Sequence, residues 1–435
     1  MKVVVIGTGY VGLVSGACFA DMGHDVVCVD TNEDKIKKLI DGQIPIYEPG
    51  LEEIVKHNAK NGRLSFSTVL ADVLNDVDVV LLAVGTPTDE SSGRADLKYV
   101  FAAAEEVAKN LSNKAVVVTK STVPVGTGGK VAQILRENCE KLECEVASNP
   151  EFLREGAAIN DFMKPDRVIV GAESTFSKNI MQRLYRPLIG EGTPILFTNV
   201  PTAELIKYAS NAFLATKIAF ANEISDICEG VGADVDQVIK GMGMDNRIGG
   251  QYMQPGPGYG GSCFPKDTLA LTHIAYDAGF PTKIVKSVIN SNDERRQRMV
   301  NKIINAAGGD VKDLEISVLG LTFKANTDDM RYSPSLVIIP QLLAKGANVS
   351  VYDPEGMEEA KKELPQENIA WCKTTEKAVM GADIVVILTE WSEFKRIDLS
   401  ELKKSMKGKL VVDLRNILDS QSVEDAGLEY VCLGK

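Results

Sequence analysis

Short apolar runs separated by longer helix-forming stretches dominate the first 150 residues of the chain. The runs are KVVVI from residue 2, DVVCV from residue 25, VDVVLLAV over 77–84 and AVVVTKST over 115–122. Runs this short, with little polar alternation, are typical of strands buried on both faces. An apolar helical stretch before Gly23 and an Ala-rich one over 97–111 lie between them. This alternation predicts a parallel, doubly wound α/β sheet.

The middle of the chain has a helical pattern instead. Residues 200 to 230 favour helix throughout, with Pro201 at the start and Gly230 at the end. At about 1.5 Å per residue such a helix is roughly 40 Å long, which is enough to link two domains. A shorter helical segment around 232–242 and the glycine-rich stretch GGQYMQPGPGYGGSCFPKD follow it.

The last third repeats the pattern of the first. Apolar runs recur at 315–323, 348–354, 382–390 and 410–416, and the second reaches Asp353 as the N-terminal one reaches Asp30. We therefore predict an α/β protein with two Rossmann-like, doubly wound domains joined by a long central helix. The expected parts are a domain over 1–199, a central helical region over 200–310 and a C-terminal domain over 311–435. The second half has Gly320-Leu321-Thr322 where the first has GxGxxG, so we do not expect it to hold a dinucleotide in the usual way.

The composition of the chain limits the partners and the kinds of catalytic chemistry that we expect. The formal charge is −12, from 48 basic and 60 acidic side chains, which argues against nucleic acid but leaves a small anionic substrate possible. Eight Cys without a CxxC pair and three His without an HExxH motif predict neither a zinc site nor any other catalytic metal. No stretch approaches the roughly 18 apolar residues of a membrane span, so we expect no membrane partner and a cytoplasmic protein.

The segment Gly7-Thr8-Gly9-Tyr10-Val11-Gly12 stands between a predicted strand and a predicted helix, the context that a dinucleotide fingerprint requires. Gly7 would make the tight turn, Gly9 would let the backbone approach the pyrophosphate, and Gly12 would let helix and strand pack closely. Asp30 follows Gly12 by 18 residues, where a carboxylate binds ribose hydroxyls and repels a 2′-phosphate. The pattern favours NAD over NADP; the alternative is a glycine-rich structural turn.

Cys263 is the candidate nucleophile. It precedes a predicted helix with Pro265 in the first turn, and Lys266 is close to it in sequence. The helix dipole and the lysine charge would stabilise a thiolate there, and the glycines before it would let backbone N–H groups bind an anion. The alternative is a buried structural thiol.

Two carboxylates belong to the segment SNPEFLREG (148–156). Asn149 is a predicted N-cap with Pro150 at the first helical position, so Glu151 and Glu155 should share one helix face. On the residues alone, the simpler interpretation is that acidic side chains in a first turn complement the helix dipole.

Three further polar residues stand where ligands bind in this fold. Lys207 and Asn211 are four apart on the long helix, so a cation and an amide converge, although such a pair is more often a solvated face. Thr122 closes the fourth predicted strand, at the carboxyl edge of the sheet.

Taken together, these motifs resemble the UDP-glucose 6-dehydrogenase family, within the UDP-glucose/GDP-mannose dehydrogenases. The resemblance covers nearly the whole chain and includes the ordered motifs GTGYVG, VGTPTDE (84–90), KSTVPVGT (120–127), SNPEFLREG, AELIKYASNAF (203–213), NRIG (246–249), PGPGYGGSCFPKD and GLTFK (320–324). It implies two Rossmann-like domains joined by a long helix, assembled as a homodimer or a larger homo-oligomer.

The resemblance also implies residue roles. Cys263 matches the nucleophile, Glu151 the hydrolytic base, and Arg247 a sugar-binding residue supplied by the neighbouring subunit. The implied catalytic set is Cys263, Lys207, Asn211, Glu151, Thr122 and Asp267, with no metal. The implied NAD contacts are Gly7, Gly9, Tyr10, Val11, Gly12, Asp30, Lys35, Thr86, Pro87, Ser121, Thr122, Glu155, Lys266 and Arg331. The implied substrate contacts are Glu151, Phe152, Leu153, Arg154, Glu155, Lys207, Asn211, Arg247, Tyr252, Gln254, Gly256, Gly260, Phe323, Lys324 and Arg415.

The implied activity is the NAD-dependent, four-electron oxidation of UDP-glucose to UDP-glucuronate, a precursor for polysaccharide biosynthesis. Two NAD⁺ are consumed, and Cys263 carries thiohemiacetal and thioester intermediates. Three alternatives remain. A sister enzyme would act on GDP-mannose or a UDP-N-acetylhexosamine. A two-electron dehydrogenase of the 6-phosphogluconate kind would not need Cys263. The third is a non-catalytic NAD-binding regulator.

Overall fold

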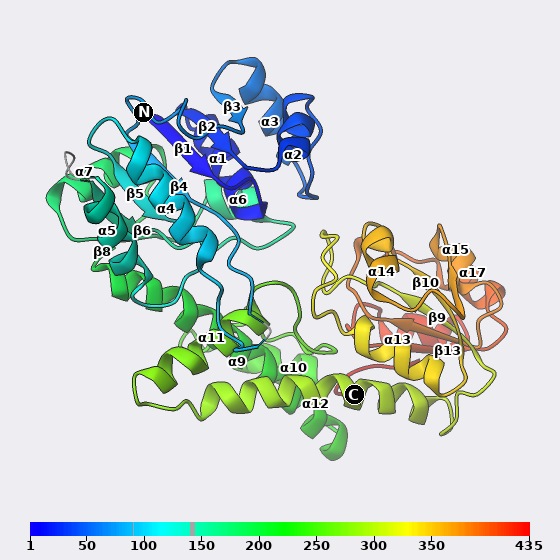
Figure 1. Ribbon diagram of the computed structural model, residues 1–435. Coiled ribbons are helices and arrows are strands. Elements are labelled where there is room, and N and C mark those ends of the chain that lie inside the picture. Colours follow the sequence, from blue (N-terminus) through cyan, green and yellow to red (C-terminus); the bar gives the residue numbers. More distant parts are fainter. Residues whose placement is uncertain (90, 140–143) are drawn as a thin grey trace. The chain divides into compact units, whose positions relative to one another are not determined.

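The computed structural model describes residues 1–89, 91–139 and 144–435 in two compact units, Met1–Ser210 and Asn211–Lys435 (Figure 1). Glu90, the last residue of the VGTPTDE motif, lies outside the described residues. The helix α9 (Val200–Val231) carries the chain from the first unit into the second. The prediction of two Rossmann-like sheets joined by a long central helix is confirmed.

The described residues of the N-terminal unit form one eight-stranded sheet with the order β3-β2-β1-β4-β5-β6-β7-β8. The strands are β1 (Lys2–Ile6), β2 (Asp25–Val29), β3 (Leu64–Ser67), β4 (Val79–Leu82), β5 (Val116–Thr119), β6 (Glu145–Ser148), β7 (Val168–Ala172) and β8 (Ile195–Thr198). Pairing is parallel, as predicted, except that β7 runs antiparallel to β6. The connection between these two strands carries only a six-residue helix, which is too short for the usual helical crossover to a parallel neighbour.

Helices cover both faces of this sheet. They are α1 (Tyr10–Asp21), α2 (Glu33–Ile40), α3 (Leu51–Lys60), α4 (Lys98–Asn110), α5 (Thr127–Asn138), α6 (Ala158–Met163), α7 (Thr175–Leu184) and α8 (Arg186–Gly190). Successive side chains of a strand point to opposite faces, so Val3 and Val5 pack with α1, α3, α6, α7 and α8, whereas Val4 and Ile6 pack with α4 and α5. Burial on both faces explains why these strands have uninterrupted apolar sequences.

The described residues of the C-terminal unit form a six-stranded parallel sheet with the order β11-β10-β9-β12-β13-β14. Its strands are β9 (Glu315–Leu319), β10 (Asn348–Tyr352), β11 (Ile369–Trp371), β12 (Ile384–Ile387), β13 (Leu410–Asp413) and β14 (Glu429–Val431). This order repeats that of the first six strands of the N-terminal sheet, which accounts for the duplicated sequence pattern.

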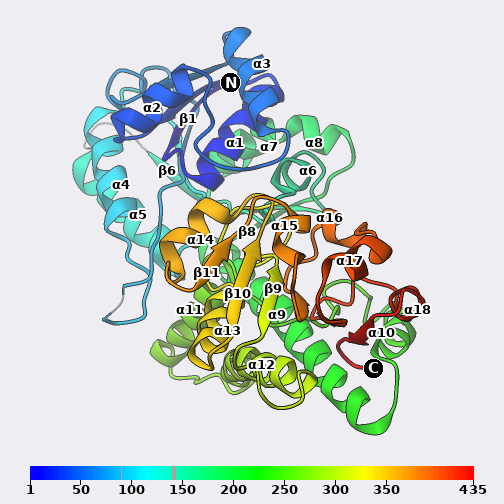
Figure 2. The same ribbon diagram turned by 90° about the vertical axis from the view of Figure 1, so that its right-hand side faces the viewer.

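The helices of this unit are α10 (Val235–Gly243), α11 (Phe264–Asp277), α12 (Ile284–Ala306), α13 (Ser335–Ala344), α14 (Met357–Glu363), α15 (Thr375–Val379), α16 (Ser392–Lys395), α17 (Leu399–Ser405) and α18 (Ser420–Asp425). One face of the sheet packs with α12 and α13, and the other packs with α15, α16 and α17 (Figure 2). None of the helices in the described part of the chain is long and apolar enough to cross a membrane.

Candidate active site

The glycine-rich turn lies between β1 and α1 in the N-terminal unit. Gly7 has φ of +99°, and a Cβ there would lie 2.6 Å from the Ala83 carbonyl oxygen. A Cβ on Gly12 would lie 1.9 Å from the carbonyl oxygen of Gly7, so helix and strand pack too closely for a side chain. At Gly9, the N-cap of α1, a Cβ would meet no atom within 4 Å. This open N-terminus fits the close approach of a pyrophosphate, with Tyr10 and Val11 in the first turn.

Asp30 follows β2, and its carboxylate faces the glycine-rich turn. Its Oδ2 accepts hydrogen bonds from the Thr8 backbone N–H at 2.9 Å and the Thr8 hydroxyl at 2.7 Å, and Lys35 Nζ lies 3.4 Å away. Burial raises the pKa of Asp30, but the hydrogen bonds from Thr8 and Asn32 and the Lys35 charge outweigh burial and hold it below its usual value. A half-buried, ionised carboxylate at this place fits a ribose hydroxyl pair.

The next two strand ends bring further predicted NAD contacts together. The Thr86 hydroxyl donates to the backbone oxygen of Thr122 at 3.0 Å, and the Ser121 hydroxyl donates to the backbone oxygen of Val84 at 2.6 Å. Pro87 is exposed beside them in sequence. These loops follow β4 and β5, at the carboxyl edge where doubly wound sheets bind ligands.

Glu151 and Lys207 form an ion pair inside the N-terminal unit, with Lys207 Nζ and Glu151 Oε1 3.2 Å apart. Their side chains are only 4% and 3% exposed. Lys207 Nζ also lies 5.3 Å from the ring centroid of Phe152, and the Arg167 guanidinium lies 3.8 Å from the same centroid. Charges this well buried are costly unless paired, so the pair is unlike the solvated lysine that the sequence alone favoured.

The helix predicted at Pro150 is wrong: α6 begins at Ala158, and the segment before it is a loop. Several of its N–H groups donate to carboxylate side chains. The Glu151 carboxylate accepts from Leu153 at 2.6 Å, and Glu48 accepts from Gly156 at 2.6 Å and from Ala158 at 2.8 Å. The four-residue spacing of Glu151 and Glu155 therefore does not place them on a helix face.

Glu48 also binds the Tyr10 hydroxyl, so it joins the first turn of α1 to the loop that carries the predicted base. Burial first, and then the hydrogen bond to Glu48, raise the pKa of Tyr10 and keep its hydroxyl neutral. Sequence reasoning missed Glu48. Its neighbours Pro49 and Gly50 indicate only a turn.

In the C-terminal unit, Cys263 is the N-cap of α11 and Pro265 lies in its first turn, as predicted. The half-buried Cys263 sulfur lies 3.5 Å from the Ser262 hydroxyl. Asp267, one turn into the helix, is fully buried and accepts from Lys266 Nζ at 2.7 Å and from Asn211 Nδ2 at 2.6 Å. The structure thus brings Asn211, Lys266 and Asp267 into direct contact.

The glycines before Cys263 pack against predicted substrate residues. A Cβ on Gly256 would lie 3.3 Å from the Arg415 guanidinium, and a Cβ on Gly260 would lie 3.0 Å from the Phe323 side chain. Gly261 lies against the Phe323 ring as well. Arg415 donates to the backbone oxygen of Phe323 at 2.8 Å, which places a cation beside this loop.

Other predicted contacts lie around this loop. Lys324 Nζ lies 5.3 Å from the Phe323 ring centroid, and the Arg331 backbone oxygen accepts from Gly261 at 2.8 Å. Tyr252 has a left-handed φ of +61°, and Gln254 is exposed. The Arg247 side chain is 89% exposed and pairs with Asp245. The last predicted substrate arginine, Arg154, belongs to the N-terminal unit and pairs with Asp161.

Four buried residues that support the Cys263 loop were not predicted. Asn222 accepts from the Gly256 N–H at 2.8 Å, and Arg295 donates to the Gly256 oxygen at 3.0 Å. Asn292 and Arg296 bind the backbone of Tyr259. Their positions on α9 and α12 gave no signal, because polar residues at helical spacing are usually solvated.

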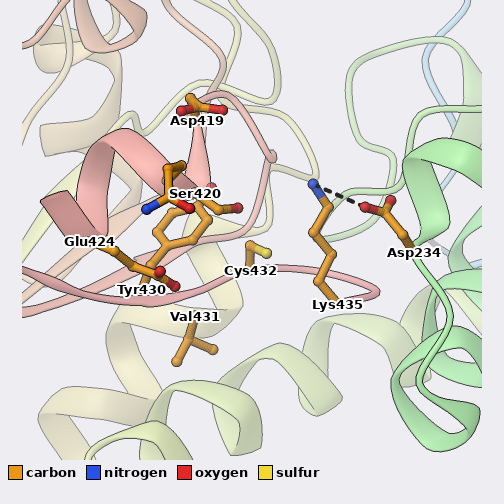
Figure 3. A pocket seen from close by; sticks show the side chains of 9 residues that line it. Asp234, Asp419, Ser420, Glu424, Tyr430, Val431, Cys432 and Lys435 are labelled. Atoms are coloured by element: carbon orange, nitrogen blue, oxygen red, sulfur yellow. Dashed lines mark ion pairs between the residues drawn. The ribbon is translucent and has the colours of Figure 1, made fainter.

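A separate pocket of about 620 Å³ lies in the C-terminal unit. It is lined by Asp234, Asp419, Ser420, Gln421, Glu424, Tyr430, Val431, Cys432 and Lys435 (Figure 3). These lining residues include three carboxylates and one cation, Lys435. The Lys435 Nζ lies 3.8 Å from the Asp234 Oδ2. This charge does not suit a diphosphate. Among the described residues, no group of three or more His, Cys, Asp or Glu side chains is arranged to hold a metal ion.

Comparison with known proteins matches three successive segments of the chain. Profiles of the UDP-glucose/GDP-mannose dehydrogenase family match as NAD binding domain (1–189), central domain (201–294) and UDP binding domain (317–420). A UDP-glucose 6-dehydrogenase from Rhizobium meliloti is 52% identical over 437 residues, covering 100% of both chains. The solved UDP-glucose dehydrogenase from Pyrobaculum islandicum is 38% identical, with a TM-score of 0.90 over 99% of this chain and 96% of that one. A UDP-D-ManNAc dehydrogenase structure from Pyrococcus horikoshii is 29% identical, with a TM-score of 0.86 over 100% and 99%.

Proposed function

Because this chain belongs to the UDP-glucose/GDP-mannose dehydrogenase family, we propose that it oxidises UDP-glucose to UDP-glucuronate with two NAD⁺ per sugar. The family predicted from the sequence motifs is confirmed, and the chain is an NAD-dependent oxidoreductase with a UDP-binding domain. The relatives favour glucose as the sugar, because the full-length UDP-glucose 6-dehydrogenase shares 52% of its residues and the UDP-D-ManNAc dehydrogenase 29%. Sister nucleotide-sugar substrates remain the alternative.

The buried Glu151–Lys207 ion pair is the observation that carries this proposal. Asn211 lies one turn beyond Lys207 on α9 and is bonded to the buried Asp267. These groups supply a carboxylate that can act as a base, and an ammonium and an amide that can donate to an oxyanion. A regulator that only binds NAD, or a two-electron dehydrogenase, needs no such base for hydrolysis.

The proposed chemistry assigns one step to each group. NAD⁺, when bound, would supply a hydride acceptor for each oxidation. In the first oxidation the alcohol carbon gives up the hydride and its hydroxyl proton leaves to water, which yields the aldehyde. The Cys263 sulfur adds to the aldehyde carbon, and Lys207 and Asn211 donate hydrogen bonds to the resulting oxygen. Loss of the second hydride leaves a thioester on Cys263. Glu151 takes a proton from water as the water oxygen attacks the thioester carbon, and the C–S bond breaks to release the Cys263 thiolate and a carboxylic acid, which loses its proton to solvent as the carboxylate.

Other assignments belong to the same proposal. Thr122 and Asp267 order the attacking water, and Arg247 reaches the sugar of a neighbouring subunit. The NAD and substrate contacts named from the family resemblance keep those roles. Their support is that the NAD set of the N-terminal unit follows the carboxyl ends of β1, β2, β4, β5 and β6. In addition, Gly256 lies against Arg415, Gly260 lies against Phe323, and Arg415 donates to the Phe323 backbone oxygen.

The stoichiometry tests this function. With NAD⁺ in excess and UDP-glucose limiting, the protein should form two NADH per sugar and release UDP-glucuronate. GDP-mannose and UDP-N-acetylhexosamines, run in parallel, should be poor substrates, and Cys263→Ala should be the inactive control. One NADH with released aldehyde would contradict the four-electron reaction, and a preference for another sugar would contradict the substrate.

We also propose that the protein forms a homodimer or a larger homo-oligomer. Phe213, Phe220 and Ile227 are 65%, 47% and 50% exposed and recur every seven residues on α9. Residues at that spacing lie on one side of a helix, and exposed apolar stripes of this kind usually mark an interface.

Two further expectations complete the proposal. The family matches support the division into a domain over 1–199, a central region over 200–310 and a C-terminal domain over 311–435. A cytoplasmic location suits a reaction that needs a reduced Cys263, because thiols stay reduced there.

A further inference from the structure

Lys120 is a buried cation that none of the assignments above uses. It directly follows β5, and the residue is 4% exposed. Its Nζ donates to Asn149 Oδ1 at 3.2 Å and lies 5.7 Å from the ring centroid of Phe162. The Tyr185 hydroxyl binds the same Asn149 oxygen. An amide oxygen and a ring face are weak compensation for a buried ammonium.

The charges that act on Lys120 are those of the predicted catalytic pair. Burial lowers the pKa of Lys120 to about 8, the Glu151 carboxylate opposes that shift, and the Lys207 charge adds to it. The other titratable group in contact with the Lys120–Asn149 hydrogen bond is Tyr185, whose pKa burial raises, so it stays neutral. Asn149, which binds Lys120, precedes Glu151 by two residues, and Glu151 pairs with Lys207 at 3.2 Å. Lys120, Lys207 and Glu151 therefore form a buried cluster that contains two lysines and one carboxylate.

The second cation has a use in the proposed reaction. In the structure Lys207 pairs with Glu151, so in this pair one ammonium balances one carboxylate. When Lys207 turns its hydrogen bonds to the oxygen that forms on the sugar, the cluster holds two negative charges. A second buried ammonium then restores neutrality, and it costs no reorganisation because it is already in place.

We propose that Lys120 is a positioning residue of the oxidation site, whose positive charge balances Glu151 while Lys207 binds the reacting oxygen. This inference rests on the proposed function. Lys120 does not touch the sugar; it acts through the Asn149 contact and the shared field of the cluster. Because it works only when protonated, the reaction should slow as pH rises through the pKa of Lys120.

Two variants test this role. Lys120→Met keeps the length of the side chain and removes the charge, and Lys120→Arg keeps a charge at every accessible pH. Lys120→Met should lower kcat on the order of tenfold or more, with little change in KM for UDP-glucose, as expected from removing a unit charge in a buried cluster. Lys120→Arg should recover part of kcat and lose the decline of kcat above about pH 8.

A stability measurement separates this role from a structural one. Removing an imperfectly compensated buried charge should leave the melting temperature of Lys120→Met equal to that of the wild type or higher. A lower melting temperature with kcat within twofold of the wild type would overturn the proposal, as would an unchanged pH profile in both variants. Failure of the wild type to form two NADH per sugar would refute the proposed function itself, which is a separate result.

Discussion

Replacing Glu151 by Gln should stop the reaction after both oxidations and before hydrolysis. The substitution removes the charge and the base. It keeps a side-chain oxygen that can accept the hydrogen bond which, in the wild type, the Leu153 N–H donates to the Glu151 carboxylate at 2.6 Å. The loop that holds residue 151 is therefore expected to remain. Because neither oxidation uses this carboxylate as a base in the proposed scheme, each active site should still form two NADH once.

The structure sets the size of two separate effects. Loss of the base should lower the steady-state rate by ~10²–10⁴-fold. Lys207, which is 3% exposed, loses its carboxylate partner, and breaking a buried pair costs about 3–5 kcal/mol. The matched control is Glu52→Gln, because Glu52 pairs with Lys56 on the surface, where such a pair contributes about 1 kcal/mol or less. The control should keep both its stability and its turnover.

Rapid mixing followed by intact-mass measurement checks the stall. Glu151→Gln with UDP-glucose and NAD⁺ should give a burst of NADH, followed by almost no turnover. The protein mass should increase by that of a nucleotide-sugar acyl group, and hydroxylamine should remove the adduct. The adduct must be absent when Cys263→Ala is combined with Glu151→Gln.

One result would refute this reasoning. If Glu151→Gln remained folded and bound both UDP-glucose and NAD⁺, but gave neither a burst nor an adduct, Glu151 would have to act before the thioester forms. The base for hydrolysis would then be another group.

The remaining predictions concern the cofactor, the assembly and the buried lysine. Asp30→Ala should weaken NAD⁺ binding and narrow the preference for NAD⁺ over NADP⁺ in binding titrations; equal use of both cofactors by the wild type would contradict the assignment. Phe220→Asp places a charge on the exposed stripe of α9 and should shift the protein towards monomer in sedimentation, whereas an unchanged oligomer would exclude that face as the interface. Mixed Arg247→Ala and Cys263→Ala chains should partly recover activity, and no recovery in verified heterodimers would count against a shared site. Burial lowers the pKa of Lys120 to about 8 in the folded protein, whereas a lysine of the unfolded chain titrates at about 10. Between these two pH values the unfolded chain binds more protons, so the free energy of unfolding of the wild type should rise with pH relative to that of Lys120→Met. Parallel curves of unfolding free energy against pH for the two proteins would contradict this.

The sheets and the nucleotide turn could be predicted because each depends on local sequence. Strands buried on both faces have uninterrupted apolar runs, and Gly7 and Gly12 are required by backbone contacts within a few residues of β1 and β4. The long helix was predictable for the same reason. Its sequence contains helix formers from end to end and Pro201 in its first turn.

The loop before α6 could not be predicted, because contacts far along the chain determine it. The pattern Asn-Pro-Glu is a good helix start, yet Glu48, more than 100 residues earlier, takes the N–H groups of Gly156 and Ala158. Lys120 was overlooked for a related reason. A lysine at the end of an apolar run could have been flagged as a buried charge, but its proximity to Glu151 and Lys207 depends on the folded unit.

The two Rossmann-like halves each have an aspartate after their second strand, but the surroundings of the two carboxylates differ. Asp30 and Asp353 each follow the second strand of their sheet. Asp353 is 1% exposed, and its oxygens accept from the backbone of Leu321 and Thr322 on one side and of Gly356 on the other. Trp391 donates to it as well.

Asp353 therefore has no oxygen left for a ribose, whereas Asp30 is half-buried and bonded mainly through one oxygen. The turn after the first strand of each half shows a matching difference in the space open to a ligand. Gly9 is open, but the corresponding Thr322 carries a side chain whose hydroxyl binds Asp353 at 3.1 Å. In the C-terminal half the corresponding carboxylate is buried and fully bonded within the protein, so a nucleotide bound by this unit must contact other groups. Arg415 and Lys324 flank Phe323 beside the Cys263 loop, and we expect these two proposed substrate contacts to supply the positive charge for the diphosphate.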